Sequence, residues 1–135
     1  MRLDFGGLQS PGAKLSQGYF ACANFRGANL ANAHLDHTWF MASDLGYVDL
    51  SGADLTHSCL FYTDLSGAIF DEQTKIDDPN RILKACIKPD EAGVSHGIRS
   101  THPDISKIAS RIPQCPNVDN RCGELGKVNG WNCGD

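Results

Sequence analysis

Five histidines and six cysteines are the residues of this chain with the chemistry to bind a metal or to form a covalent link. His34, His37 and His57 fall close together in the sequence, with Asp36 and Asp54 beside them. Imidazole nitrogens and carboxylate oxygens are common zinc ligands, so this cluster suggests a metal site. The stretch lacks the closed ligand spacing of a structural zinc motif, which favours a solvated polar ladder instead. His37 and His57 are retained as weak metal candidates, and no cofactor is predicted.

Four cysteines lie in an irregular C-terminal segment that is rich in Gly, Asn and Pro. They are Cys86, Cys115, Cys122 and Cys133. An even number of cysteines in such a segment favours two disulfides formed in an oxidising compartment. Free thiols in a cytosolic protein, or a zinc site completed by His96 or His102, are the alternatives, but no Cys-x-x-Cys pair supports zinc. The tail therefore predicts an extracytoplasmic location, either lumenal, periplasmic or secreted.

Catalytic motifs are not evident in the sequence. Ser95-His96-Gly97 and Ser100-Thr101-His102 place hydroxyls beside histidines, but neighbours in sequence do not make a catalytic triad. No P-loop, dinucleotide-binding motif or nucleophile elbow occurs. A net charge of −4 argues against direct binding of nucleic acid, and no run of about 18 apolar residues predicts a membrane span. We therefore predict a non-enzymatic protein.

The elements that must position these residues follow from a five-residue rhythm across residues 12–71. Leu or Phe recurs at every fifth position, and this series is the predicted core: Leu15, Phe20, Phe25, Leu30, Leu35, Phe40, Leu45, Leu50, Leu55, Leu60, Leu65 and Phe70. A small or β-branched residue stands two positions before each of them. A period of five fits neither a helix nor a strand. The rhythm indicates a tandem repeat of the kind that builds solenoids.

Three units match the A-(D/N)-L-X-X pattern at its defined positions, with Phe replacing Leu in one of them. They begin at Ala23-Asn24-Phe25, Ala28-Asn29-Leu30 and Ala53-Asp54-Leu55. Over about half of its length the chain thus resembles the pentapeptide-repeat family, and most closely its small lumenal or secreted members with a helical, cysteine-containing C-terminal cap. The resemblance implies an all-β solenoid: a right-handed quadrilateral β-helix with four pentapeptides per coil and about three coils.

Three segments are predicted. Residues 1–11 form an N-terminal cap or degenerate half-coil, because Ser10 occupies a central position and Pro11-Gly12 marks a turn. Residues 12–72 form the β-helix, and residues 73–135 form a helical and loop region that holds four cysteines. Two short helices are expected in this last segment, bounded by Pro79 and Pro89 and by Pro103 and Pro113. The apolar face of the first would hold Ile82, Leu83, Cys86 and Ile87, and that of the second Ile105, Ile108, Ala109 and Ile112.

With four units per coil, residues twenty apart stack on one face, so the surfaces can be assigned from sequence. The face centred on Phe20, Phe40 and Leu60 is unusually apolar, and we call it the aromatic face. Its outward positions hold Tyr19, Ala21, Cys22, Trp39, Met41, Ala42, Cys59, Phe61 and Tyr62. A contiguous apolar patch indicates an interface, for which the predicted anchors are Tyr19, Trp39, Met41, Phe61 and Tyr62.

The occupant of the aromatic face remains open between an unknown protein partner, a second copy of the chain and the chain's own C-terminal tail. Cys22 and Cys59 lie on this face two coils apart, so about 10 Å separates their coils. That distance exceeds the reach of a disulfide, and both cysteines are expected to be free.

Two other faces are mixed to acidic, and one column of outward positions reads Asn24, Asp44, Asp64. Some members of the family resemble duplex DNA in shape and charge and bind type II topoisomerases, which makes gyrase protection the alternative function. The short column and mild acidity favour ordinary solubility instead. The predicted function is a protein-interaction or scaffold module that presents flat side-chain ladders, with metal binding through the stacked histidines as a further alternative.

Overall fold

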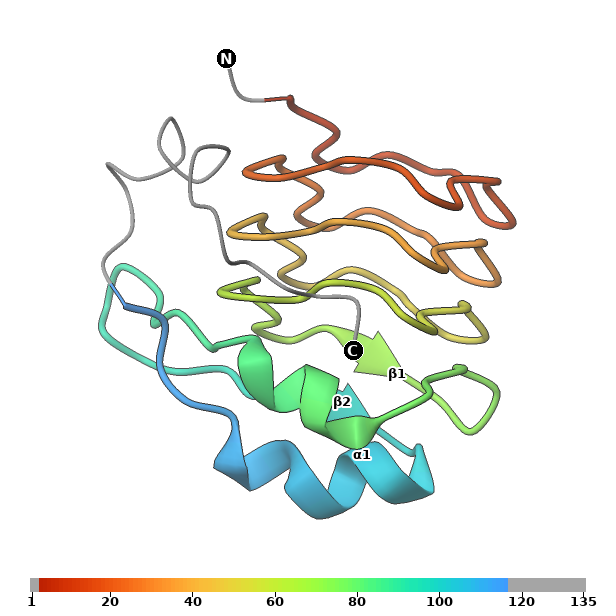
Figure 1. Ribbon diagram of the computed structural model, residues 1–135. Helices are drawn as coiled ribbons and strands as arrows, with labels where there is room; N and C mark the ends of the chain where they lie inside the picture. The colour runs from red at the N-terminus through yellow and green to blue at the C-terminus, as the bar shows by residue number, and fades with distance from the viewer. Residues whose placement is uncertain (1–2, 117–135) are drawn as a thin grey trace, which may run out of the picture.

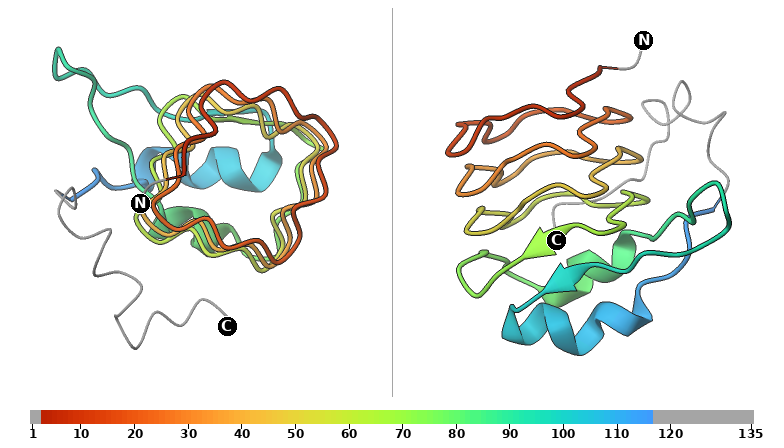
Figure 2. Two further views of the ribbon diagram at one scale, coloured as in Figure 1. Left: turned by 90° about the horizontal axis from the view of Figure 1, so that it is seen from above. Right: turned by 180° about the vertical axis from the view of Figure 1, so that it is seen from behind.

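The structure is a computed structural model that describes residues 3–116 (Figure 1). Its main body is a column in which the chain winds around four sides, seen end-on as one repeated outline in Figure 2. Parallel bridges join residues twenty positions apart on each side, as in Asp4 to Asn24 and Asn24 to Asp44. The bridges are isolated rungs, and within residues 3–116 only β1 (Ile69–Phe70) and β2 (Arg99–Ser100) extend to two residues. The chain is a β-helical solenoid.

Each side of the column ends in a tight turn that starts at the central Leu or Phe. The amide three residues later donates to the central carbonyl, as Ala23 N donates to Phe20 O over 3.1 Å. The corner residue, two positions after the central one, takes a positive φ, for example 60° at Cys22 and 58° at His37. This is the geometry of a type II turn, which favours Gly or Asn at that position. Every corner side chain is thereby directed away from the core.

The core of the column confirms the register assigned from the five-residue rhythm. The central Leu and Phe side chains from Phe25 to Phe70 are buried, and so are the small residues two positions before them. At Thr38, Ser43 and Ser58 the hydroxyl donates to the preceding central carbonyl, as Ser58 Oγ does to Leu55 O over 2.7 Å. Thr63 Oγ1 instead donates to Phe40 O of the coil before it, also over 2.7 Å. A polar group can therefore occupy the interior without an unsatisfied hydrogen bond.

The N-terminal end of the column holds a stack of aromatic rings. Phe5 lies 4.8 Å from Phe25 between ring centroids, and Phe20 lies 5.7 Å from Phe40, both in stacked orientation. Residues 3–11 keep the twenty-residue pairing even though Ser10 replaces a central residue, since Gln9 bridges to Asn29. These first rungs have no coil above them in the described chain, and their central side chains are only partly buried.

The C-terminal end of the column is covered by short elements that follow the repeats. The strand β2 pairs in parallel with β1. The 3₁₀ helix η1 (Pro79–Lys84) lies below the last coil, and the helix α1 (Pro103–Ile108) packs against it from further below (Figure 1). A second 3₁₀ turn, η2 (Ala109–Arg111), extends α1. Ile82 and Ile105 are fully buried and join the core of the column. None of these described helices is long and apolar enough to cross a membrane.

The first expected helix differs from its prediction. It begins as expected, with Asp78 accepting a hydrogen bond from Asn80 N, but η1 is a 3₁₀ helix and ends at Lys84. Cys86 and Ile87 were assigned to its apolar face; they instead bridge to Asp64 and Gln114. The last coil offers unpaired backbone groups at Thr63 and Leu65, and Cys86 satisfies both through 2.9 Å hydrogen bonds. Completing the sheet edge outweighs about one further turn of a short helix.

Candidate interaction surface

The aromatic face is present where the sequence places it. Tyr19 bridges to Trp39 and Trp39 to Cys59, so these three residues form one column of the face. Tyr19 and Trp39 are 57% and 38% exposed, and their ring centroids are 6.4 Å apart. Tyr62 is 40% exposed at a corner. These three predicted anchors therefore present aromatic surface to solvent.

The other two predicted anchors are placed differently. Met41 is buried and forms a small cluster with Cys59, against which Ala21 and Phe61 pack. The Phe61 ring is partly buried, and the Lys84 ammonium lies 6.0 Å from its centroid. Met41 is thus unavailable to a partner in this structure, although its position in the repeat directs it outward.

The cysteines of the aromatic face correct a prediction. Cys22 and Cys59 were expected to be free thiols, and that expectation is wrong, because both are disulfide-bonded. The separation of about 10 Å between their coils excludes a bond between Cys22 and Cys59 themselves. It does not exclude a bond from either of them to another cysteine.

One predicted disulfide is present within the described residues. Cys86 and Cys115 are bonded, with their Cα atoms 4.7 Å apart. The bond ties the chain after η2 back to the rung that completes the column. Cys122 and Cys133, the other two candidates, lie outside the described residues.

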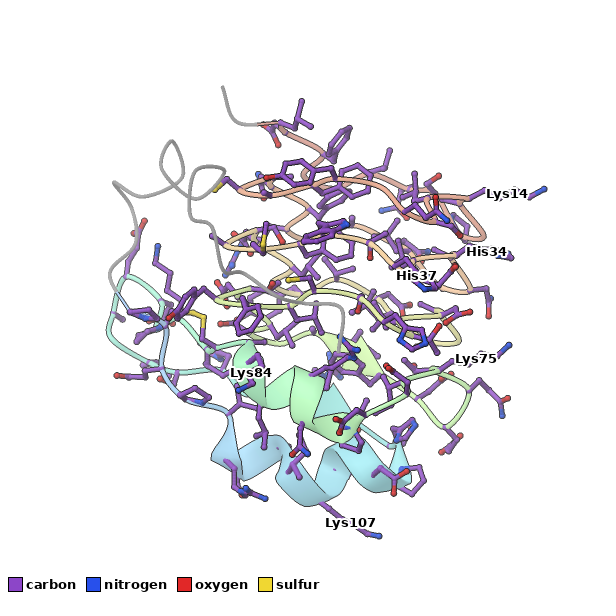
Figure 3. All side chains as sticks on the ribbon, viewed as in Figure 1. Lys14, His34, His37, Lys75, Lys84 and Lys107 are labelled. Atoms are coloured by element: carbon purple, nitrogen blue, oxygen red, sulfur yellow. A yellow bond between two sulfur atoms is a disulfide. The ribbon has the colours of Figure 1, made fainter. Side chains whose placement is uncertain are left out.

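The histidine ladder lies on another side of the column, where His34 and His37 point outward (Figure 3). The rings of His37 and His57 stack with centroids 4.9 Å apart. Each Nδ1 faces a carboxylate, 3.5 Å from Asp36 for His37 and 3.1 Å from Asp77 for His57. Within residues 3–116 no three His, Cys, Asp or Glu side chains gather as a metal site requires. The weak metal candidates are therefore paired with carboxylates on an exposed surface.

Both of these carboxylates have lowered pKa values. A hydrogen bond from the Ser16 hydroxyl is the main reason that the pKa of Asp36 lies below its ordinary value. Burial raises the pKa of Asp77, but the His57 amide and the Arg81 guanidinium more than offset it, and the net shift is downward. The two aspartates are therefore held in their charged form by neighbours within the chain.

The acidic column is partly neutralised by a cation on the same side. Arg26 Nη1 lies 3.3 Å from Asp44 and 3.6 Å from Asp64, and its guanidinium stacks 4.9 Å from the Tyr47 ring. Asp64 is buried and also accepts hydrogen bonds from the amide and hydroxyl of Ser66. These carboxylates are turned toward donors of the protein itself.

A profile described as "Pentapeptide repeats" matches the chain in eight copies, over residues 12–46 and 42–71. Residues 12–71 are pentapeptide repeats of this family. A crystal structure of a pentapeptide repeat protein from Nostoc Pcc 7120 aligns with 73% of this chain and 80% of that chain, at 20% identity and a TM-score of 0.29. This degree of likeness adds nothing to the fold described above. No curated protein matches the chain.

Pentapeptide-repeat proteins are generally non-enzymatic, and the remaining histidines of this member have structural contacts. His102 Nδ1 accepts hydrogen bonds from the amides of Asp104 and Ile105 and so caps the N-terminus of α1. His96 Nε2 lies 2.9 Å from Asp90, and this hydrogen bond is the main cause that lowers the pKa of Asp90. The sequence signal for the cap was His102 directly before Pro103, the first residue of a predicted helix.

Proposed function

We propose that this pentapeptide-repeat protein is a non-enzymatic protein-interaction or scaffold module. The observation that carries the proposal is the exposed pair formed by Tyr19 and Trp39 on a rigid, sheet-like face. Aromatic rings supply a large contact area and lose little conformational entropy on binding, which is why they are enriched among interface anchors. Here the backbone ladder already holds the two rings in adjacent rungs, so a partner meets a preorganised surface.

The partner that suits this surface is a protein with an apolar recess for two adjacent rings. The pair lies on the side of the column between the histidine ladder and the acidic column. The units of this side, residues 18–22, 38–42 and 58–62, contain no charged residue, so charge contributes little to the surface. We infer no catalytic role and no direct contact with nucleic acid or membrane. Identifying that partner would define the physiological role of the module.

An extracytoplasmic location is part of the proposal. The bond between Cys86 and Cys115, together with the bonded state of Cys22 and Cys59, supports it, because disulfides persist in oxidising compartments. The check is to alkylate thiols in intact cells before lysis. Native protein should carry no alkylated cysteine, whereas full alkylation would contradict the proposed location.

We also infer the finer geometry of the column that the family resemblance implies: a right-handed quadrilateral β-helix with about three coils over residues 12–71. Sixty residues paired at intervals of twenty support the coil number. An experimental structure with a left-handed winding would contradict the handedness.

A pull-down from the native host tests the interaction proposal. The full-length protein is compared with the double variant Tyr19→Ala/Trp39→Ala and with Tyr47→Ala, which removes an exposed ring from another face. A protein captured by native chain and by Tyr47→Ala, but lost with the double variant, would support the proposal. Equal capture by all three, or no capture above an uncoupled resin, would contradict it.

A further inference from the structure

The N-terminal end of the column presents backbone groups that have no partner within residues 3–116. The first coil has one rung residue on each side, and these are Asp4, Gln9, Lys14 and Tyr19. One coil later, Asn24 N donates to Leu3 O and Asn24 O accepts from Phe5 N, so both groups of a rung residue point toward the N-terminal end. The amides and carbonyls of the four first rungs point the same way and bond to nothing in the described part of the chain.

The same end also exposes apolar side chains. Leu3 and Leu8 occupy the inward position two residues before the central one, and they are 46% and 37% exposed. Ala23 and Ala28 hold the same position one coil later and are buried. The end of the column therefore combines an open sheet edge with uncovered apolar surface, and both favour contact with another protein surface.

The opposite end of the column is covered by the chain itself. Lys75, Cys86 and Arg99 bridge to three sides of the last coil, and η1 and α1 lie beyond it (Figure 1). Two copies of the chain therefore cannot stack head to tail through their coils. Contact between two open ends uses the same surface of both copies and gives a closed, two-fold symmetric pair.

We propose that two copies of the chain stack head to head through their first coils. A second copy is the partner that fits, because it has the same four-sided outline and the same open rungs. A two-fold axis across the end makes facing rungs antiparallel, and directly facing residues then exchange both of their backbone hydrogen bonds. This contact is independent of the function proposed above, which uses the aromatic face.

The charges of the first coil select one arrangement of the two copies. Asp4 and Lys14 are exposed on opposite sides of the column. A two-fold axis through the sides of Gln9 and Tyr19 places Asp4 of each copy opposite Lys14 of the other. An axis through the sides of Asp4 and Lys14 places like charges opposite each other twice, and a diagonal axis leaves each charge facing an uncharged rung. Opposite charges on facing strands stabilise a sheet and like charges destabilise it, so the first arrangement is favoured.

The rise of the chain keeps the aromatic pair outside this contact. Each coil climbs about 4.8 Å, so Asp4 lies nearest the end and Tyr19 furthest from it. In the favoured arrangement the sides of Asp4, Gln9 and Lys14 meet the second copy at one common spacing. The two Tyr19 rungs remain about 4.8 Å further apart than the other facing rungs. The dimer therefore leaves the rings of Tyr19 and Trp39 accessible.

Charge reversal tests this arrangement by sedimentation velocity of the full-length protein at low ionic strength. Native protein should sediment as a dimer. Asp4→Lys and Lys14→Asp each put like charges opposite one another twice, and each should weaken dimerisation by at least about tenfold. An equimolar mixture of these two variants should dimerise again, because the lysine introduced at position 4 then faces the aspartate introduced at position 14. The matched control, Lys107→Asp on α1, changes an exposed charge at the covered end and should dimerise as native protein does.

A double substitution separates loss of the contact from loss of the fold. Asp4→Lys/Lys14→Asp restores opposite charges on facing rungs and should dimerise as native protein does, with a native circular dichroism spectrum. Native protein that stays monomeric at every concentration, single variants with native dimerisation, or a mixture of the single variants that stays monomeric would each overturn the proposal.

Discussion

The aromatic face and the histidine face, which carries the ladder of His37 and His57, have the same backbone geometry, yet their corner side chains differ in exposure to solvent. Gln17, His37 and His57 are exposed at the corners of one face, whereas Cys22 and Ala42 are buried at the corners of the other. The turns are equivalent, since φ is 58° at His37 and 57° at Ala42. The repeat therefore decides where a side chain points, and the rest of the chain decides whether it meets solvent.

The largest effect is expected from breaking the column that both faces share. Leu50 is fully buried, so Leu50→Asp places a charge in the interior with no partner and should abolish cooperative unfolding. Leu50→Met conserves the volume and should cost less than about 1.5 kcal/mol. Circular dichroism melts of the two variants are the measurement. A normal melt for Leu50→Asp would mean that the register is wrong.

The next largest effect concerns the bond at the end of the column. Cys86→Ser/Cys115→Ser removes a disulfide that closes 29 residues, and the free energy of unfolding should fall by about 3–4 kcal/mol. The loss should appear in urea titrations. The bond lies at the end of the column that both faces share, so its loss should destabilise both faces together. An unchanged free energy of unfolding would contradict this role of the bond.

A matched pair of corner substitutions compares the two faces directly. Ala42→Asp places a charge at a corner that is buried and should lower the free energy of unfolding by at least about 2 kcal/mol. Gln17→Asp occupies the equivalent corner of the histidine face and should change it by no more than about 0.5 kcal/mol. Asp tolerates a positive φ at both sites, so backbone strain does not favour either variant. Equal costs in urea titrations would remove the distinction between the faces.

The smallest effect is a pH dependence at the end of the last repeat. Burial raises the pKa of Asp71, but the amides of Gly52, Gln73 and Thr74 donate to its carboxylate, and the net shift is downward. A lowered folded pKa contributes stability above the unfolded value near 4 that is lost as the pH falls through the folded value. Asp71→Asn should therefore lose about 1 kcal/mol at pH 7 and show a weaker fall in stability below pH 4.

The neighbouring residue supplies the control for this pH dependence. Glu72 is exposed, so Glu72→Gln should leave the acid dependence of unfolding unchanged. Identical urea titrations of Asp71→Asn and native protein from pH 7 to pH 2 would contradict the role of Asp71.

The column was predictable because its signal is local and repeated. A Leu or Phe at every fifth position leaves one inward register, and the buried series from Phe25 to Phe70 confirms it. The helix starts at Pro79 and Pro103 were predictable for a similar reason, since capping depends on adjacent residues.

The backbone bridges of Cys86 and Ile87 and the disulfide bonds of Cys22 and Cys59 were not predicted. Cys86 and Ile87 fit a helical face in sequence, and only the open edge of the last coil explains why they form bridges instead. The bonded state of Cys22 and Cys59 was missed because the prediction weighed only the distance between them. In both cases the outcome depends on pairing that the local sequence pattern does not contain.

Oxidation of Met41 by hydrogen peroxide is the most direct test of the claim that the centre of the aromatic face is shielded from solvent while the rings of Tyr19 and Trp39 are exposed. Sulfoxide formation at this residue, followed by mass spectrometry, reports the access of solvent to the centre of the face. Because Met41 is 3% exposed, its oxidation should be slow in the native protein relative to the urea-unfolded chain. Equal oxidation rates of Met41 in the native and the unfolded protein would contradict this description of the face.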